Sequence, residues 1–199
     1  MRMIKIFGIF FLLSMSFLPV GAAADKTPVR LARLPIIFAH NKPNFETCAT
    51  LETKLSRAFS IPMNGTLQLA DYIDSQESSA ALNEIWRELR AKNKKASLTE
   101  AMRPLAEKIN ADIILCPVLR RYSEVHVQSN RNLETKIISN VAATLIVYDR
   151  RTDELIEKKD SRSFNDGSSR FGKASYLAGE CFDRLIDATK IRQKINAIK

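Results

Sequence analysis

The stretch ADIILCPVLRRYSEVHVQSNRNLETKIISNVAATLIVYDRRTDELIEKKDSRSF, residues 111–164, decides the fold of this chain. It contains three runs rich in apolar and β-branched residues, at 111–128, 135–149 and 154–164, separated by the polar segments SNRN and RRTD. Runs of this kind joined by polar turns predict an antiparallel meander of three strands. The residues expected to be buried in it are Ile113 or Ile114, Leu115, Val118, Val141, Leu145 and Val147.

The segment before residue 64 is expected to form a strand, a helix and a second strand. Residues 29–41 read as the first strand, and Pro35 places that strand at a sheet edge or a bend near its end. Asn44 is the expected cap of the helix that follows. Residues 59–63 are expected to be a short strand. The apolar face of the helix comes from residues at spacings of three and four, namely Phe45, Cys48, Leu51, Leu55 and Phe59.

Helical patterns dominate the residues between this segment and the meander. Residues 66–91 read as helix in one or two pieces, with Trp86 as a core anchor in preference to a ligand platform. Ser97 and Glu100 have the spacing of a capping box, which opens another helix that Asn110 can end.

A final helix is expected at about 172–191, and the element order becomes β-α-β-α-α-β-β-β-α. Early strands that alternate with helices, followed by a run of strands, predict an α/β (α+β) fold. The sheet is expected to be mixed, with parallel and antiparallel parts, and to be covered by helices.

The first 24 residues have the pattern of a secretory signal peptide. Arg2 and Lys5 precede the apolar run IFGIFFLLSMSFLPV, and Ala22 to Ala24 supply the small residues of a cleavage site. The predicted mature chain, 25–199, is then an exported single α/β domain in the periplasm or outside the cell. Because the first cysteine is Cys48, a lipid anchor at the cut is not expected, and no later apolar run is long enough to span a bilayer.

The mature chain is basic. The chain has 31 Lys and Arg residues, two of them in the first 24 positions, and 22 Asp and Glu residues, which leaves a formal charge of +7 after cleavage. Export removes nucleic acid as a partner and leaves anionic envelope polymers, lipid headgroups or acidic proteins. A basic protein whose charge binds nothing is an equal alternative.

Three cysteines are too few for a disulfide scaffold. Cys48 and Cys181 lie on the apolar faces of the first and last helices, and Cys116 lies in the first strand of the meander. A Cys48–Cys181 bond is a candidate if the two helices are neighbours on one sheet face. The alternative is three small core residues.

The nearest approach to a phosphate-binding motif is GSSRFGKA at 167–174. It matches G-x-x-x-x-G-K, but Ala174 stands where Ser or Thr should hold Mg²⁺. A plain loop before a helix is the preferred interpretation. A reduced version remains, in which Arg170, Gly172 and Lys173 contact an anion at the helix start.

No residues form a recognisable catalytic or metal-binding set. His40 and His126 are interpreted as surface histidines, and the cysteines lie in apolar patterns. A hydrolase would need one of these histidines beside a nucleophile and an acid. The chain is therefore expected to have no catalytic, cofactor or metal site.

Two segments carry a resemblance to a family of exported bacterial proteins. They are AEKINADIILCPVL at 106–119 and ATLIVYDRRTDELIE at 143–157. Together with the element order from Val29 to Lys190, they resemble the amino-terminal domain of TolB and its relatives, the curli secretion protein CsgG and the activator LpoB. The resemblance implies an α/β sandwich that binds other envelope proteins or assembles with itself, without catalysis.

The sequence thus predicts a non-enzymatic interaction module of the bacterial cell envelope. A basic protein that binds an anionic envelope polymer or lipid headgroups is the alternative, and an unrecognised hydrolase is a third class.

Overall fold

The computed structural model describes residues 28–59, 70–128, 135–167 and 169–196. The predicted signal peptide, the SNRN turn and residues 60–63 lie outside the described residues. The elements are β1 (Val29–Arg33), β2 (Ile37–Phe38), α1 (Phe45–Phe59), β3 (Ala70–Ile73), α2 (Ser75–Lys92), α3 (Leu98–Lys108), β4 (Ile113–Gln128), β5 (Thr135–Asp149), β6 (Glu154–Gly167), a 3₁₀ turn η1 (Arg170–Gly172), α4 (Ala174–Thr189) and α5 (Ile191–Asn196).

The predicted mixed α/β sheet is confirmed. Its strand order is β3-β1-β4-β5-β6, and β2 pairs with β4 further along the same edge that β1 uses. β1 is parallel to β3 and β4, while β4, β5 and β6 are antiparallel neighbours. β6 therefore forms one edge of the sheet.

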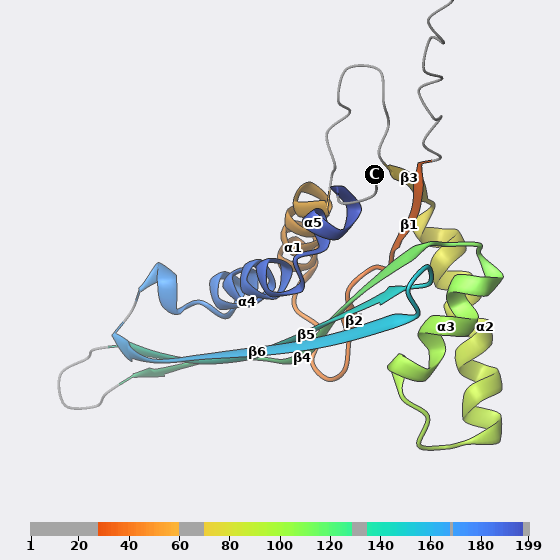
Figure 1. Cartoon of the computed structure of the whole chain (residues 1–199). Helices are drawn as coiled ribbons and strands as arrows, with labels where there is room; N and C mark the ends of the chain where they lie inside the picture. Colours follow the sequence, from red (N-terminus) through yellow and green to blue (C-terminus); the bar gives the residue numbers. More distant parts are fainter. Residues whose placement is uncertain (1–27, 60–69, 129–134, 168, 197–199) are drawn as a thin grey trace, which may run out of the picture.

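Helices cover both faces of the sheet, but unequally (Figure 1). α1 and α4 pack on one face over a core that includes Leu55, Leu145 and Phe182. α2 and α3 pack on the other face over Met102, Ile114 and other apolar residues. None of the described helices is long and apolar enough to cross a membrane.

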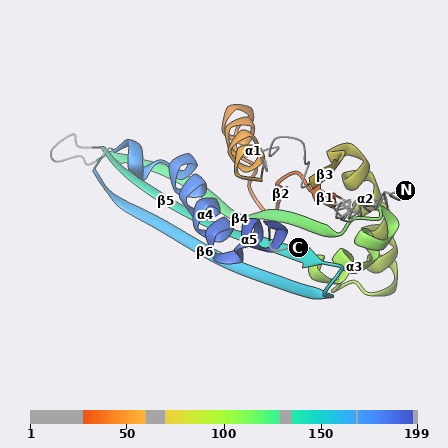
Figure 2. The same cartoon turned by 45° about the horizontal axis from the view of Figure 1, so that its top comes forward.

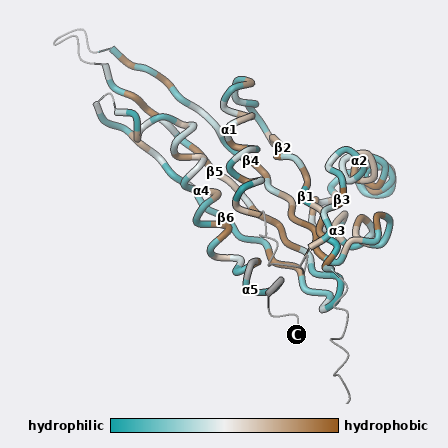
Figure 3. Tube along the Cα trace, turned by 90° about the horizontal axis from the view of Figure 1, so that it is seen from above, coloured by the Kyte–Doolittle hydropathy of each residue, from teal (hydrophilic) through white to brown (hydrophobic). Residues whose placement is uncertain are grey.

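The three long strands extend past α2 and α3 as an arm, which we define as residues 120–128, 135–144 and 159–167 (Figure 2). A register shift between Leu119 and Arg121 marks where the arm begins on β4. Hydrophobic colouring in β4 and β5 is densest near β1, where both faces of these strands are covered (Figure 3). Every residue expected to be buried in the meander is buried.

Asp112 fixes the start of β4 between two neighbours. Its carboxylate accepts hydrogen bonds from the Arg30 backbone N–H at 2.9 Å and from the Arg150 guanidinium at 3.1 Å. Its own backbone N–H and C=O bond to the same two residues at 2.8 Å each. One residue thus joins β1, β4 and the end of β5.

Two predicted strands differ from the observed ones. Residues 29–41 form β1 and β2 instead of one strand, because the chain bends at Pro35, which lacks the N–H that a ladder needs. Phe59 ends α1 instead of starting a strand. The next strand in the described residues is β3, which lies in the segment predicted as helix. The helix starts later because Asp74 caps it, accepting from the N–H groups of Gln76 and Glu77.

The other helix ends follow the sequence signals more closely. Asn44 accepts a bond from the Thr47 N–H at 2.9 Å, and Ser97 donates its N–H to Glu100 Oε1 at 3.0 Å, as expected for caps. Asn110 ends α3 with a φ of 49°. Phe45, however, is 87% exposed, because the buried face of α1 begins nearly two turns later, at Leu51.

We expect Leu145→Ala to lower the free energy of unfolding by about 2–5 kcal/mol, since Leu145 is fully buried between the sheet and α4. Urea unfolding measures the change. Leu155→Ala removes the same atoms from a side chain that is 43% exposed and should cost about 0.5 kcal/mol or less. Equal losses in the two variants would contradict the position of the core.

Candidate functional site

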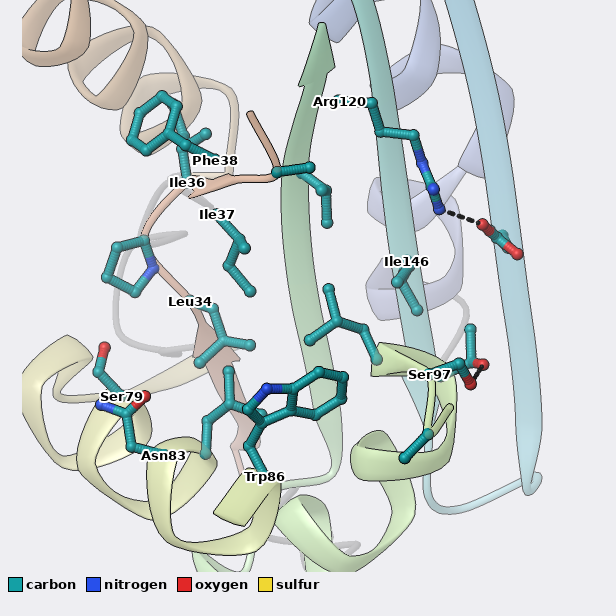
Figure 4. A pocket seen from close by; sticks show the side chains of 18 of the residues that line it. Leu34, Ile36, Ile37, Phe38, Ser79, Asn83, Trp86, Ser97, Arg120 and Ile146 are labelled. Atoms are coloured by element: carbon teal, nitrogen blue, oxygen red, sulfur yellow. Dashed lines mark hydrogen bonds and ion pairs between the residues drawn. The ribbon is translucent and has the colours of Figure 1, made fainter. Parts of the chain in front are cut away.

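A groove of about 770 Å³ opens on the face of the sheet that carries α2 and α3. Its walls are the bend between β1 and β2, the side of α2 and the start of α3, and its floor is the sheet (Figure 4). Most lining side chains are apolar. The main ones are Leu34, Pro35, Ile36, Ile37, Phe38, Leu82, Trp86, Leu98, Val118 and Ile146.

The bend at Pro35 creates the groove. After Leu34, whose N–H bonds to the Leu115 carbonyl at 2.9 Å, the chain leaves the sheet and returns at β2 to pair with Val118 and Leu119. Ile36 is held out of the ladder because its N–H donates to Glu52 on α1 at 2.6 Å. The detour forms one apolar wall of the groove, in which Ile37 and Phe38 are only half-buried.

Trp86 is both a packing residue and part of the groove surface. It is half-buried against the core under α2 and α3, as the core-anchor interpretation requires. Its ring also lines the groove, and the Arg90 guanidinium lies over it at 4.8 Å from the centroid. Figure 4 shows the indole pointing from α2 toward the sheet, where it forms part of the groove surface.

Charged residues close the end of the groove that faces the arm. Arg120 donates to Thr144 Oγ1 at 2.7 Å and to Glu157 at 3.1 Å, and Lys159 lies 3.2 Å from the same carboxylate. Arg120 continues the alternation of Ile114, Cys116 and Val118 on this face, and the register shift places Arg121 opposite Ala142 on the same face. The groove therefore joins an apolar floor to a predominantly basic end.

A second cavity of about 430 Å³ lies on the opposite face, where the amino termini of α1 and α4 approach β4. Glu124 on β4 dominates it. One carboxylate oxygen accepts the Ala174 N–H at 2.7 Å, and the other lies 2.9 Å from His126 Nε2. Burial alone raises the pKa of Glu124, but these two bonds and nearby Lys173 outweigh it, so the pKa lies below its ordinary value.

An anion contact was predicted at Arg170, Gly172 and Lys173, and the Glu124 carboxylate lies at this helix start. The start of α4 already holds a carboxylate from the protein itself. Gly172 is buried against Phe164 and donates its N–H to Ser169, and the Arg170 guanidinium stacks on Phe171. The prediction failed to include this carboxylate because Glu124 is 50 residues away in the sequence.

The same cavity brings His126, Glu124 and Ser175 together, the composition a hydrolase would need. A working triad places the histidine between the acid and the nucleophile. In the described residues His126 bonds to Glu124, and no hydrogen bond connects it with Ser175. Both histidines are exposed, as predicted, and His40 lies outside this cavity. The described part of the chain contains no group of three His, Cys, Asp or Glu residues that could hold a metal ion.

All three cysteines are free thiols in the structure. The premise of the predicted Cys48–Cys181 bond is met, since α1 and α4 pack on the same core. The two thiols have different neighbours, however: Cys48 Sγ donates to the Pro43 carbonyl, and Cys181 lies beside Asp160. Cys48 and Cys181 are thus separate thiols in this structure, and the candidate bond between them is tested by the labelling experiment below.

The fold and the groove together define a mixed α/β protein with an apolar surface groove and a projecting arm. No protein-family model matches the sequence. No curated protein matches it either.

Solved structures with a similar arrangement come from bacteria. The hypothetical protein CT253 from Chlamydia trachomatis is 14% identical with a TM-score of 0.42, over 83% of this chain and 95% of that one. The PelC dodecamer from Paraburkholderia phytofirmans is 12% identical with a TM-score of 0.38, over 80% and 85%. The LpoB C-terminal domain from Escherichia coli is 14% identical with a TM-score of 0.35, over 76% and 90%. LpoB is one of the proteins that the sequence resembles, and at these identities the similarity concerns the fold alone.

We expect Glu124→Gln to lower the free energy of unfolding at neutral pH by about 0.5–1 kcal/mol, because it removes the charge held at the start of α4. The folded-state pKa of Glu124 is lowered, so its contribution is present above the unfolded value of about 4.3 and is lost as pH falls through the folded pKa. The difference between wild type and variant should therefore shrink below about pH 4. Urea unfolding between pH 3 and 7 measures it, with Glu88→Gln on an exposed part of α2 as the control.

We expect iodoacetamide at pH 8 to label Cys48 quickly in the native protein and the other two cysteines only after unfolding. Burial raises the pKa of the Cys116 thiol to about 12, and burial with nearby Asp160 raises the pKa of Cys181 to about 12. Mass spectrometry of protein unfolded without reductant should show three labelled cysteines. A single label, on Cys116, would support the candidate Cys48–Cys181 disulfide.

Proposed function

We propose that this chain is a non-enzymatic interaction module of the bacterial cell envelope, exported by residues 1–24, which binds a partner protein through the groove. The observation that carries the proposal is the apolar lining of the groove beside Trp86 and Arg90. Aromatic residues and arginine are enriched among the residues that dominate protein–protein binding energies.

The hydroxyl groups of the groove are engaged in structural bonds, which supports binding over catalysis. The Ser79 hydroxyl donates to the Ser75 carbonyl at 2.6 Å, and the Ser97 hydroxyl donates to Glu100 at 2.9 Å. Arg120 and Lys159 share the carboxylate of Glu157. The Ser79 hydroxyl faces only a backbone carbonyl. The Ser97 N–H and hydroxyl both donate to Glu100 and lower its pKa, which makes this carboxylate a poor base for activating a nucleophile.

The pairing of basic residues disfavours the alternative of a general polyanion binder. Much of the positive charge is matched locally by carboxylates, at distances of a hydrogen-bonded ion pair. The paired cations include Arg33, Lys54, Arg103, Lys108, Arg150 and Arg151. A footprint for an anionic polymer would present these cations unpaired.

We expect Asn83→Arg to reduce capture of the partner from an envelope extract by about tenfold or more, because it places a long charged side chain in the groove. Ala91→Arg adds the same side chain to an exposed position of α2 outside the groove lining and serves as the control.

The salt dependence of partner capture distinguishes binding in the groove from binding to an anionic polymer. A partner held by a packed apolar groove should stay bound at high salt, whereas a partner held by charge alone should be lost at modest salt. Equal capture by wild type and Asn83→Arg, together with loss at modest salt, would replace the groove by the polyanion function.

A further inference from the structure

The arm has one covered face and one open face. α4 packs along one side, where Ile137, Ser139 and Val141 are buried. On the other side no described element covers the strands (Figures 1 and 2), and Val125 and Val127 are 54% and 44% exposed. Because side chains alternate along each strand, the open face consists of Arg121, Ser123, Val125, Val127, Lys136, Ile138, Asn140, Ala142, Lys159, Ser161, Ser163 and Asn165.

The open face has the dimensions of a helix. Three strands spaced about 4.8 Å apart give a surface roughly 10 Å wide, and eight residues of β4 give roughly 25 Å of length. A helix is about 10–12 Å in diameter, and about 17 residues span that length. α4, with 16 residues, covers the opposite face of the same strands.

The side chains of the open face also suit a helix. Ser123, Ala142, Ser161 and Ser163 are small and allow close approach, while Val125 and Ile138 are apolar. The backbone of β5 is satisfied on both sides by β4 and β6. A partner strand would have to join an edge, whereas a helix packs on the face through its side chains.

The charge of the open face is positive. Arg120, Arg121, Lys136 and Lys159 face the same side as a single acid, Glu157. Arg121 and Lys136 have no ion-pair partner among the described residues. This unpaired charge contrasts with the matched ion pairs elsewhere and requires acidic residues on whatever covers the face.

We propose that the open face is the docking surface for an acidic amphipathic helix of a partner protein, about 17 residues long. Arg120, Glu157 and Lys159 belong both to the end of the groove and to the start of the open face, so the helix leads directly into the groove. The proposal rests on the groove function above and adds the structure and the charge of the partner segment.

Photo-crosslinking in the cells that produce the protein tests the proposal. Benzoylphenylalanine is placed at Val125 and Ser163 on the open face, at Asn83 in the groove, and at exposed Arg184 on α4 as the control. We expect the first three positions to label the same protein, and the adducts at Val125 and Ser163 to lie in one segment with apolar residues at spacings of three and four and acidic residues beside them. Arg184 should not label that segment.

Charge reversal provides the second readout. Arg121→Glu should reduce the adduct at Ser163 by about tenfold, and replacing the facing acid of the partner segment by lysine should restore it. Arg184→Glu, with the same charge change on α4, should leave the adduct unchanged. Circular dichroism checks that each variant is folded.

Several results would overturn the proposal. They are open-face adducts that contain a second copy of this chain, adducts on phospholipid, adducts on a segment without acidic residues, or no open-face adduct at all. If Asn83 still labels a partner in the last case, the groove function stands and only the helix proposal fails. If Asn83 also gives no protein adduct, both fail.

Discussion

The antiparallel ladder between β4 and β5 is the interaction on which the rest of the molecule depends. It runs without a gap in the described residues from Ile113 opposite Asp149 to Gln128 opposite Thr135, with one register shift at the start of the arm. The parallel strands β1 and β2 pair with β4 only as far as Leu119. Helices therefore cover both faces of the ladder at the end near β1, whereas in the arm a helix covers only one face.

The sequence predicted this ladder because its signal is local. The apolar runs and polar turns of 111–164 lie next to each other in the chain, and pairing neighbours along the chain needs no long loop closure. β3 was missed because ADYI precedes a strong helical pattern without a glycine or proline between them. Asp74 and Glu77 have capping-box spacing, and reading them as the helix start would have separated strand from helix.

Local sequence patterns could not have predicted the groove or the hydrogen bonds that Glu124 forms with Ala174 and His126. The groove combines residues from the bend after β1, from two helices and from the strands β2, β4, β5 and β6, so no window of sequence contains it. Glu124 similarly occupies the start of α4 only because β4 and α4 are packed together. Sequence reasoning identified the favourable amides at that helix start, while the tertiary fold determined which anion occupies them. Pro35 was the one local sign of the groove, and it was interpreted only as a bend.

The position of β6 at the sheet edge has a consequence for how the protein behaves at high concentration. An edge of 14 residues would ordinarily invite further strands to add and sheets to grow from molecule to molecule. Here Lys158, Asp160 and Arg162 alternate on the α4 side of β6, and Glu157 and Lys159 lie on the other. An incoming strand would have to desolvate charges on both sides at once. The charges on β6 thus disfavour the addition of a further strand along this edge of the arm.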